Sequence, residues 1–479
     1  MTGLRELDAK LRYHFPGVVV NKALTQLHEV SRLPRYVAEY LLTTICGDNP
    51  TPDKLKKLSE IVRRHYPEPR EKELVKKILI EEGTYRLIDE FRVSIDVKRK
   101  LAKAEIPCLE IKDAMIAQEL LDQYPGLLRG GLWALAELRY EPDMVPRDTH
   151  GRPLQSPILI ARMTPFQVAE ADLDEFREKR AHFTTEEWID VLFNTIGLNP
   201  EVYPKRAKLL IISRLIPLVE PNVNMIELGP KATGKTYIYR NISYYVRLIA
   251  GGRVSPAVLF YNIARRTDGE IALRDCVVFD EIPRMSFYNA DEMMAKLKDY
   301  MESGHYERGP KKAHSTCSLV FMGNVEIRGR VPVEEFTYYL PDYMRDAAFI
   351  DRLYGFVPGW EIPKIGRAEE FLSRHYGFAT DYFCEIMHQL RQVDFTHYIK
   401  ENVELIEAGK NMSIRDQRAM VKLASGMLKL LCPHGEFGRE ELELCMSIAV
   451  EYRQHIADWL YKIDPGEYPR KKFDYILHL

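Results

Sequence analysis

The sequence predicts an α/β protein in which a parallel β-sheet carries helices on both faces, with a smaller α+β region before it and a helical region after it. Three observations predict this fold class. Apolar segments of helical and strand period alternate from about residue 205 to about residue 360, as in a parallel sheet connected by helices. Helical periodicity then continues almost unbroken from residue 366. Earlier, Phe91–Val97 alternates apolar and polar residues as a half-buried strand does.

These changes of pattern divide the chain into four regions. In chain order we expect an N-terminal helical region at 1–82, a β-rich region at 83–180, the α/β core at 181–365, and a helical lid with a C-terminal tail at 366–479. The first is helical because Leu4, Leu7 and Leu11 recur at spacings of three and four. In the last, helical periodicity with charged faces continues without glycine-rich loops.

Short strands separated by Gly- and Pro-rich turns characterise the second region. After Phe91–Val97, the strand candidates are Ile106–Ile111, Leu132–Tyr140 and Pro157–Arg162. Antiparallel strands at this spacing predict a small barrel, for which an OB-like fold is the candidate. The core then begins with a helix, since Thr184 and Glu187 have the spacing of a capping box, and this helix should end near Gly197.

The composition is that of a globular chain with no global charge signal. Of the 479 residues, 68 are Lys or Arg and 70 are Asp or Glu, which gives a formal net charge of −2. Any interaction with nucleic acid must therefore rest on local charge, such as the excess of basic residues between Lys54 and Lys103. A solvated helix surface is the more common explanation of such a run taken by itself.

We expect a cytoplasmic protein without a membrane segment. The apolar run Leu209–Val219 is interrupted by Ser213, Arg214 and Pro217 and is shorter than the roughly 20 residues a membrane helix needs. The N-terminus has no apolar stretch typical of a signal peptide. The seven cysteines are scattered and never spaced CxxC, as expected for reduced thiols.

A phosphate-binding loop is the strongest motif. Gly229-Pro230-Lys231-Ala232-Thr233-Gly234-Lys235-Thr236 matches GxxxxGK[ST] between an apolar strand, Met225–Leu228, and a helix from Tyr237 onward. Backbone N–H groups of such a loop surround phosphates at the positive end of a helix. Lys235 should reach the β- and γ-phosphates and Thr236 should ligate Mg²⁺, which indicates a nucleoside triphosphate site.

A pair of carboxylates supports this assignment. Asp280 and Glu281 directly follow the apolar strand Val277–Phe279. Asp280 is placed to hold Mg²⁺, and Glu281 to polarise a water molecule for attack on the γ-phosphate. An acidic turn after a buried strand is common, so this motif gains its weight from the preceding P-loop.

Three further polar positions complete the order of motifs of one NTPase class. Asn324 closes the apolar strand Ser318–Gly323, Arg352 follows an apolar turn, and Arg415 lies at the start of a helix opened by Ser413. This order resembles the Walker A, Walker B, sensor 1, arginine finger and sensor 2 of AAA+ ATPases. The resemblance implies that Asn324 is sensor 1, that Arg352 acts on a neighbouring subunit's nucleotide, and that Arg415 is sensor 2.

Two of these arginines have close rivals. Arg345 competes with Arg352 for the finger role, and Arg418 competes with Arg415 for the sensor 2 role. A surface salt bridge is the ordinary alternative for any lone arginine. No NKxD guanine-reading motif is present, so ATP is expected rather than GTP.

Two basic hairpins suggest what the ATPase acts on. Arg265 and Arg266 lie in a turn before the Walker B strand, and Arg308, Lys311 and Lys312 lie in a turn before the sensor 1 strand. They resemble the helix-2 insert and pre-sensor-1 hairpin of the clade that includes MCM helicases and Lon, where such hairpins line the pore of a hexamer. Phosphate contacts by these five cations would position DNA without reading its bases, whereas solvated basic turns are the plain alternative.

A closer resemblance extends over nearly the whole chain. The segments LGPKATGKTYIY, VVFDEIPRMSF, LVFMGNVE and FIDRLYGFVPGWEIPK, with PRYVAEYLL upstream, resemble the BrxL family, the Lon-protease-like AAA+ proteins of BREX phage-defence systems. The resemblance implies an ATP- and Mg²⁺-dependent ring, a hexamer or double hexamer, which engages DNA together with other BREX proteins. Longer members carry a Lon-like protease domain after the lid. The residues after Glu440 are too few for one, so we expect no protease activity from this chain.

Two other functions remain open from the sequence. Because Lon belongs to the same clade, the chain could instead be a protein-remodelling or protease-regulatory ATPase acting on polypeptide. In a third reading it is a binding scaffold in which ATP only stabilises the ring.

Overall fold

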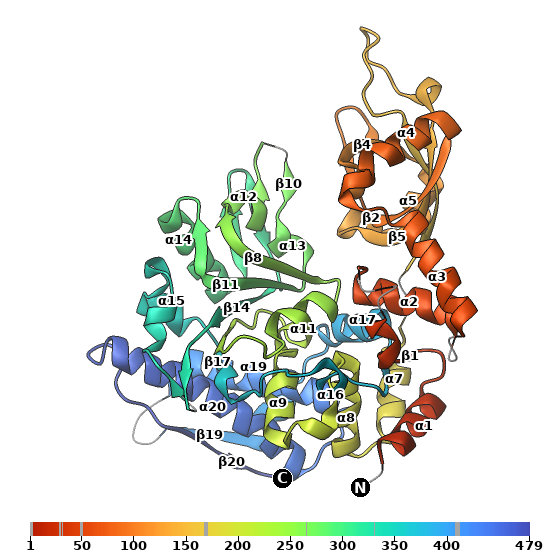
Figure 1. Cartoon of the computed structure of the whole chain (residues 1–479). Helices are drawn as coiled ribbons and strands as arrows, with labels where there is room; N and C mark the ends of the chain where they lie inside the picture. The colour runs from red at the N-terminus through yellow and green to blue at the C-terminus, as the bar shows by residue number, and fades with distance from the viewer. Residues whose placement is uncertain are drawn as a thin grey trace. The chain divides into compact units, whose positions relative to one another are not determined.

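A computed structural model of the chain groups its residues into two compact units (Figure 1), which are described separately below. One unit contains residues 23–169, and the other joins residues 1–22 to residues 170–479. The described residues are 3–27, 30, 32–47, 51–166, 171–264, 266–329, 331–407 and 412–479.

The unit of residues 23–169 is a closed five-stranded barrel with helices packed against it. Its main elements are α2 (Arg35–Cys46), α3 (Pro52–His65), α4 (Lys72–Glu82), β2 (Thr84–Asp96), β3 (Leu101–Ile106), β4 (Ile111–Ile116), α5 (Gln118–Gln123), α6 (Gly126–Arg129), β5 (Leu132–Tyr140) and β6 (Ile158–Pro165). The barrel order is β2-β3-β4-β6-β5, with β4 and β6 parallel. The strand β2 closes the barrel because its first part pairs with β5 and its last part pairs with β3.

The expected division at residue 82 falls inside this unit. Val75 and Leu79 of α4 are buried in the same apolar core as Leu87, Phe91 and Ile160 of the barrel strands. One strand expectation was wrong: Ile106–Ile111 is the connection between β3 and β4 and contains a 3₁₀ turn at Pro107–Leu109. Apolar and polar residues alternate there as in a strand, although the chain makes a tight turn that separates two strands.

The other unit is built on a five-stranded sheet. Its order is β17 (Gly355–Pro358), β7 (Met225–Gly229), β14 (Ser318–Asn324), β11 (Cys276–Phe287) and β8 (Val246–Val254). All four strand pairings are parallel. The predicted parallel sheet is therefore confirmed, and the strands of the P-loop, Walker B and sensor 1 motifs all belong to it.

Helices cover both faces of this sheet because its connections run in two directions. The connection from β7 to β8 contains α11 (Lys235–Asn241) and crosses the sheet one way. The connections after β8, β11 and β14 run the other way, through α13 (Glu270–Leu273), α14 (Ala290–Ser303) and α15 (Ala347–Asp351). Right-handed crossovers in opposite directions place their helices on opposite faces, as Figure 1 shows for α11 and α14. Ligands of such sheets bind at the carboxyl ends of the strands where the direction changes.

The remaining elements of this unit precede the sheet, lie in its connections or follow it. They are α1 (Leu4–His14), β1 (Val19–Asn21), α7 (Leu173–Arg180), α8 (Thr185–Ile196), α9 (Lys205–Ser213), α10 (Ile216–Val219), α12 (Pro256–Leu259), β9 (Tyr261–Asn262), β10 (Thr267–Asp268), β12 (His305–Arg308), β13 (Lys311–His314), β15 (Ile327–Arg328), β16 (Val331–Pro332), α16 (Ala368–Phe371), β18 (Tyr376–Phe378), α17 (Thr380–Leu390), α18 (Thr396–Asn402), β19 (Val403–Glu407), α19 (Ile414–Leu431), α20 (Arg439–Ile463) and β20 (Phe473–Leu477). The capping box of α8 at Thr184 and its end at Gly197 are confirmed.

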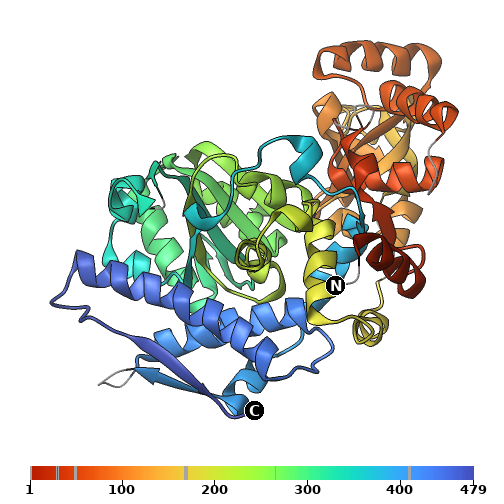
Figure 2. The same ribbon diagram turned by 60° about the horizontal axis from the view of Figure 1, so that its bottom comes forward.

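The region from residue 366 onward is mostly helical and belongs to the same compact unit as the sheet. Figure 2 shows α19 and α20 lying along one side of the unit, with the β19–β20 ribbon beside them. Ile456 and Trp459 of α20 share the apolar core of Phe321 and Phe356 in the sheet. Helical periodicity did not predict β18, which pairs with β1 near the start of the chain. No helix among the residues that the structure describes is long and apolar enough to span a membrane.

Candidate nucleotide-binding site

The P-loop leaves the carboxyl end of β7 and returns into α11. Its backbone turns through left-handed positions at Ala232, with φ of 66°, and at Gly234, with φ of 78°. The loop also approaches another backbone closely, since a side chain at Gly229 would lie 2.7 Å from the carbonyl carbon of Gly359. The N–H groups that follow Gly234 begin α11, as a phosphate-binding loop requires.

The ammonium group of Lys235 lies among the ends of two neighbouring strands. Its Nζ donates to the carbonyl oxygens of Gly229 (3.0 Å) and Pro230 (2.8 Å) and to Oδ1 of Asn324 (3.3 Å). Burial lowers the pKa of Lys235 to about 8. Three neutral oxygens thus hold an ammonium group that a phosphate oxygen would stabilise more strongly.

Thr236, in the first turn of α11, contacts Asp280 of β11. The Thr236 hydroxyl donates to Oδ2 of Asp280 at 2.7 Å. Asp280 is buried, with 6% of its surface exposed. A hydroxyl and a carboxylate are oxygen ligands of the kind Mg²⁺ takes beside substrate phosphates, so this pair fits the expected metal.

Glu281 stands in a strained backbone position. Its φ is 55°, and the pairing of β11 with β8 shifts register between Asp280 and Met285. A non-glycine residue in the left-handed region stores strain, which is found most often at functional sites. Because of this irregularity, Glu281 does not follow the regular alternation of side chains between the two faces of the sheet.

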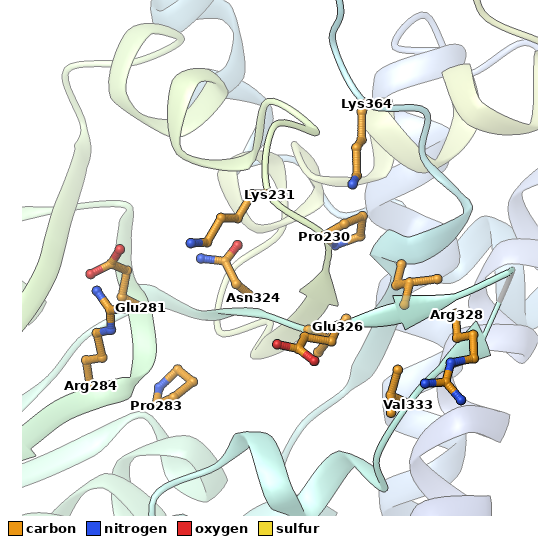
Figure 3. A pocket seen from close by; sticks show the side chains of 12 residues that line it. Pro230, Lys231, Glu281, Pro283, Arg284, Asn324, Glu326, Arg328, Val333 and Lys364 are labelled. Atoms are coloured by element: carbon orange, nitrogen blue, oxygen red, sulfur yellow. The ribbon is translucent and has the colours of Figure 1, made fainter.

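A cavity of about 650 Å³ opens beside these groups (Figure 3). The P-loop, the ends of β11 and β14, the β15–β16 hairpin and the segment after β17 line it. The lining residues are Pro230, Lys231, Glu281, Pro283, Arg284, Asn324, Val325, Glu326, Ile327, Arg328, Val333 and Lys364. Figure 3 shows the side chains of Glu281, Lys231 and Asn324 directed into the same space.

The candidate finger and sensor 2 arginines form one cluster that does not line this cavity. Arg415 bonds to Asp351 and Glu302, and Arg352 lies 3.7 Å from the same Glu302 carboxylate. The rival Arg418 is also near Glu302, at 3.8 Å. Arg352, Arg415 and Arg418 therefore share a carboxylate on α14.

A buried ion pair supports the cluster from α20. Arg453 bonds to Asp351 at 2.8 Å and to Asp416 at 2.7 Å. The other rival, Arg345, lies apart, paired with Asp342 at 2.7 Å. The structure thus brings Arg352 together with both sensor 2 candidates, but not with Arg345.

The two basic hairpins exist and pack against each other. They are β9–β10 and β12–β13. Arg308 donates to the backbone oxygen of Tyr261, and Lys311 pairs with Asp268 at 2.8 Å, so these two cations of the second hairpin bind the first. Ile263 lies against Gly309.

Most of the hairpin cations therefore already have partners. Lys312 pairs with Glu307 of its own hairpin at 2.8 Å. Arg266 is exposed and has no ion pair with any described residue, while Arg265 lies outside the described residues. The proposed DNA contacts of Arg308, Lys311 and Lys312 would require them to exchange these partners.

An arginine behind the P-loop escaped the sequence analysis. Arg214, between α9 and α10, forms a bidentate pair with Glu227 of β7 and donates to the backbone oxygen of Thr233. Both side chains are fully buried. The signal was present, because each is a lone charge within an apolar segment, where an unpaired charge would be very unfavourable.

Comparisons with known proteins agree with this architecture. Residues 158–474 match the family model described as Lon-like protease BrxL-like, ATPase domain. Residues 13–140 match the BREX system Lon protease-like protein BrxL N-terminal model. The chain belongs to the BrxL family. The match of the first model covers the whole five-stranded sheet, which supports an ATPase domain here.

Two curated BrxL-family relatives align along almost the whole chain. The Lon-like protease BrxL of Escherichia coli O9:H4 (strain HS) is 35% identical over 98% of this chain and 67% of its own length. The Lon-like protease BrxL of Bacillus cereus (strain H3081.97) is 35% identical over 99% of this chain and 69% of its own length. The family of this chain, suggested by its motifs, is thereby confirmed, and with it an association with BREX defence systems.

Proposed function

We propose that the chain is an ATP-hydrolysing AAA+ ring protein that engages DNA as part of a BREX anti-phage system. The single observation that carries the ATPase proposal is the convergence of four side chains at the strand ends. Lys235 and Thr236 at the start of α11 contact Asn324 of β14 and Asp280 of β11 respectively. Glu281 lies beside them at an open cavity.

Each of these residues has a role in hydrolysis. Lys235 would bind the β- and γ-phosphates, and Asn324 would orient the attacking water. Glu281 would accept the proton of that water as its oxygen bonds to the γ-phosphorus and the bond to the bridging oxygen of ADP breaks. Mg²⁺, held by Thr236 and Asp280, would supply positive charge to the phosphate oxygens.

A ring explains the position of the arginine cluster. Arg352, Arg415 and Arg418 gather around Glu302 rather than at their own P-loop cavity. In a hexamer or double hexamer, this cluster would face the nucleotide of a neighbouring subunit and stabilise negative charge on its γ-phosphate. We therefore assign the finger role to Arg352 and propose that the sensor 2 arginine acts on the same neighbouring site.

DNA engagement draws support from both compact units. In the barrel, Lys98, Arg99 and Lys100 form the turn between β2 and β3, and Lys98 and Lys100 have no ion pair with a described residue. The strand order of the barrel is compatible with an OB-like fold, a common platform for oligonucleotides. In the ATPase unit, Arg266 offers an exposed cation.

One experiment tests these proposals together. ATP turnover and particle size should be measured with and without duplex DNA for the wild-type chain, Lys235→Ala and Glu281→Gln. We expect DNA to stimulate turnover, Lys235→Ala to lose nucleotide binding, and Glu281→Gln to bind ATP without hydrolysing it. Stimulation by unfolded polypeptide instead of DNA would favour the protein-remodelling alternative, and peptide-bond cleavage would overturn the expectation of no protease activity.

A further inference from the structure

One outer face of the barrel carries arginines from three adjacent strands. Arg86 of β2 lies directly opposite Glu137 of β5, and Glu137 in turn lies directly opposite Arg162 of β6. Directly opposed residues of neighbouring strands point to the same face of a sheet, so Glu137 lies between two arginines. Arg139, two residues further along β5, points to this face as well. Arg86 and Arg162 are exposed.

Of these three cations, Arg139 alone has a partner of opposite charge among the described residues. It donates from Nε (2.9 Å) and from a terminal nitrogen (2.6 Å) to the same oxygen of Glu137. Arg86 and Arg162 form no ion pair with any residue that the structure describes. The hydrogen bonds from Arg139 hold the pKa of Glu137 below its usual range, and the charges of Arg139, Arg162 and Arg86 lower it further. Three cations therefore surround one carboxylate, which leaves an excess of two positive charges.

The end of α3 extends this cationic surface. The Tyr85 hydroxyl donates to the backbone oxygen of Arg64 at 2.6 Å, and Nδ1 of His65 donates to the backbone oxygen of Arg86 at 2.9 Å. These bonds hold the last turn of α3 against the start of β2. The side chain of Arg64 is exposed and has no ion pair with a described residue. We call the surface formed by these side chains the arginine face, which consists of Arg64, Arg86, Arg139 and Arg162.

The chemistry of the arginine face favours a polyanion over a folded protein as its partner. All four cations are arginines, whose planar guanidinium group can donate two parallel hydrogen bonds to a phosphate. Interfaces between proteins usually have a core of apolar and aromatic side chains. None of the exposed large apolar side chains that the structure describes lies on α3, β5, β6 or the first part of β2. A row of phosphates needs no such core, because charge alone supplies most of the affinity.

We propose that the arginine face binds the phosphate backbone of DNA, at a surface separate from the turn between β2 and β3. The inference rests on the proposed DNA engagement of the chain and adds a second contact area to the barrel. Oligonucleotides bind OB barrels over their second and third strands and two of the connecting loops. The second and third strands of this barrel are β3 and β4, whereas the arginines lie on β2, β5 and β6. Contacts to phosphates position DNA without reading its bases, so binding here is independent of sequence.

Fluorescence anisotropy of the full chain with a labelled DNA duplex tests this proposal. The variants are Arg86→Gln, Arg162→Gln and the double variant. Arg470→Gln is the matched control, because Arg470 is an exposed arginine of the other unit and also has no ion pair with a described residue. Each single variant should weaken binding about five- to tenfold at about 0.1 M salt, and should reduce the slope of log affinity against log salt concentration by about 0.9 in magnitude. The double variant should reduce this slope by about 1.8, and Arg470→Gln should leave affinity and slope unchanged.

Two further variants separate phosphate binding from a structural role. Arg86→Lys combined with Arg162→Lys keeps both charges and should keep the wild-type salt slope. Glu137→Gln removes the shared carboxylate and should tighten duplex binding. A loss of affinity without a change of slope in the double glutamine variant would show that the arginines act through the structure of the barrel, which overturns the proposal.

A competing partner is tested with polyglutamate, which carries carboxylates in place of phosphates. The proposal is overturned if the double glutamine variant loses affinity for polyglutamate but binds duplex DNA with wild-type affinity and slope. It is equally overturned if that variant binds both ligands as the wild type does. Absence of duplex binding in the wild-type chain would instead contradict the proposed DNA engagement itself.

Discussion

Arg214 and Glu227 form a bidentate ion pair directly behind the P-loop, with nitrogen–oxygen distances of 2.9 and 2.6 Å. The third nitrogen of the guanidinium group donates to the backbone oxygen of Thr233 at 3.0 Å. Neither side chain is accessible to water. The pair therefore fixes the loop that would hold the phosphates by joining it to β7 and to the end of α9.

This pair predicts separable effects on stability and on nucleotide binding. Arg214→Met leaves the Glu227 carboxylate buried without a partner and should lower the free energy of unfolding by about 3–5 kcal/mol. Replacing both, as Arg214→Met with Glu227→Leu, should recover most of that loss because no charge remains unpaired. The double variant should still bind ADP more weakly, since Thr233 has lost its donor. Urea unfolding and ADP titration measure the two effects, and normal ADP affinity in the double variant would refute a positioning role.

The pKa of Lys235 predicts how nucleotide binding depends on pH. Burial lowers the pKa of Lys235 to about 8 in the nucleotide-free protein, from an ordinary value of 10.5. Phosphate binds the charged ammonium form, so affinity should fall roughly tenfold between pH 7 and pH 9, with proton uptake on binding. Calorimetry in two buffers of different ionisation enthalpy measures this uptake. Lys472→Gln changes an exposed lysine that does not line the cavity and should behave as the wild type, whereas pH-independent affinity would contradict the assignment.

The same shift affects the stability of the nucleotide-free protein. Between about pH 8 and pH 10.5 the unfolded chain holds a proton on Lys235 that the folded chain has released. The contribution of this residue to stability therefore increases as pH rises through that window, and below it the burial of the charge is fully unfavourable.

The backbone strain at Glu281 predicts a variant that is more stable but inactive. Glu281→Gly relieves a φ of 55° and should raise the free energy of unfolding by about 1 kcal/mol. Glu281→Gln keeps the strain and should leave stability unchanged. Both should slow ATP turnover by about 10²- to 10⁴-fold because the general base is gone. Urea unfolding compared with turnover checks this, and a destabilised glycine variant would show that the conformation is not strained.

The arginine cluster predicts complementation between two inactive variants. Arg352→Ala should bind ATP but not hydrolyse it, and Lys235→Ala should bind none. A mixture of the two contains interfaces at which a wild-type P-loop faces a wild-type Arg352, so activity should reappear. Recovery to about a quarter of the wild-type rate follows if subunits mix randomly and each interface acts independently. Arg345→Ala serves as the control and should remain active, because Arg345 lies apart from the cluster. A mixture with no activity would indicate that Arg352 acts within its own subunit.

Much of the ATPase unit could be predicted because its signals are local. The P-loop lies between β7 and α11 as expected, and Asn324 ends β14. In the barrel, β5 has the predicted bounds Leu132–Tyr140. In each case apolar periodicity and turn residues lie within a short window of sequence, which is where such patterns are informative.

The parts that escaped prediction depend on distant pairings. The strand β1 pairs with β18, more than 350 residues later, so residues 1–22 belong with the ATPase unit rather than with the helices that follow them. The partner of Lys311 is Asp268 on the other hairpin, which only the packed structure reveals. Local charge predicted cations at the hairpins correctly, but it could not show that Lys311 and Lys312 are already neutralised by Asp268 and Glu307.

That neutralisation predicts which cations dominate DNA binding. Lys98→Gln, Lys100→Gln and Arg266→Gln each remove a cation that has no ion-pair partner among the described residues, and each should weaken duplex binding for all sequences alike. For every DNA phosphate that is no longer neutralised, the slope of log affinity against log salt concentration should fall in magnitude by about 0.9. Lys312→Gln should have a smaller effect, because its ion pair with Glu307 must first be broken before it can reach a phosphate. Lys311→Gln should instead loosen the two hairpins, which limited proteolysis would detect as faster cleavage near Ile263.

Fluorescence anisotropy over a series of salt concentrations measures the slopes of log DNA affinity against log salt concentration. Equal losses of affinity for Lys312→Gln and Lys98→Gln would show that the hairpin ion pairs open freely when DNA binds.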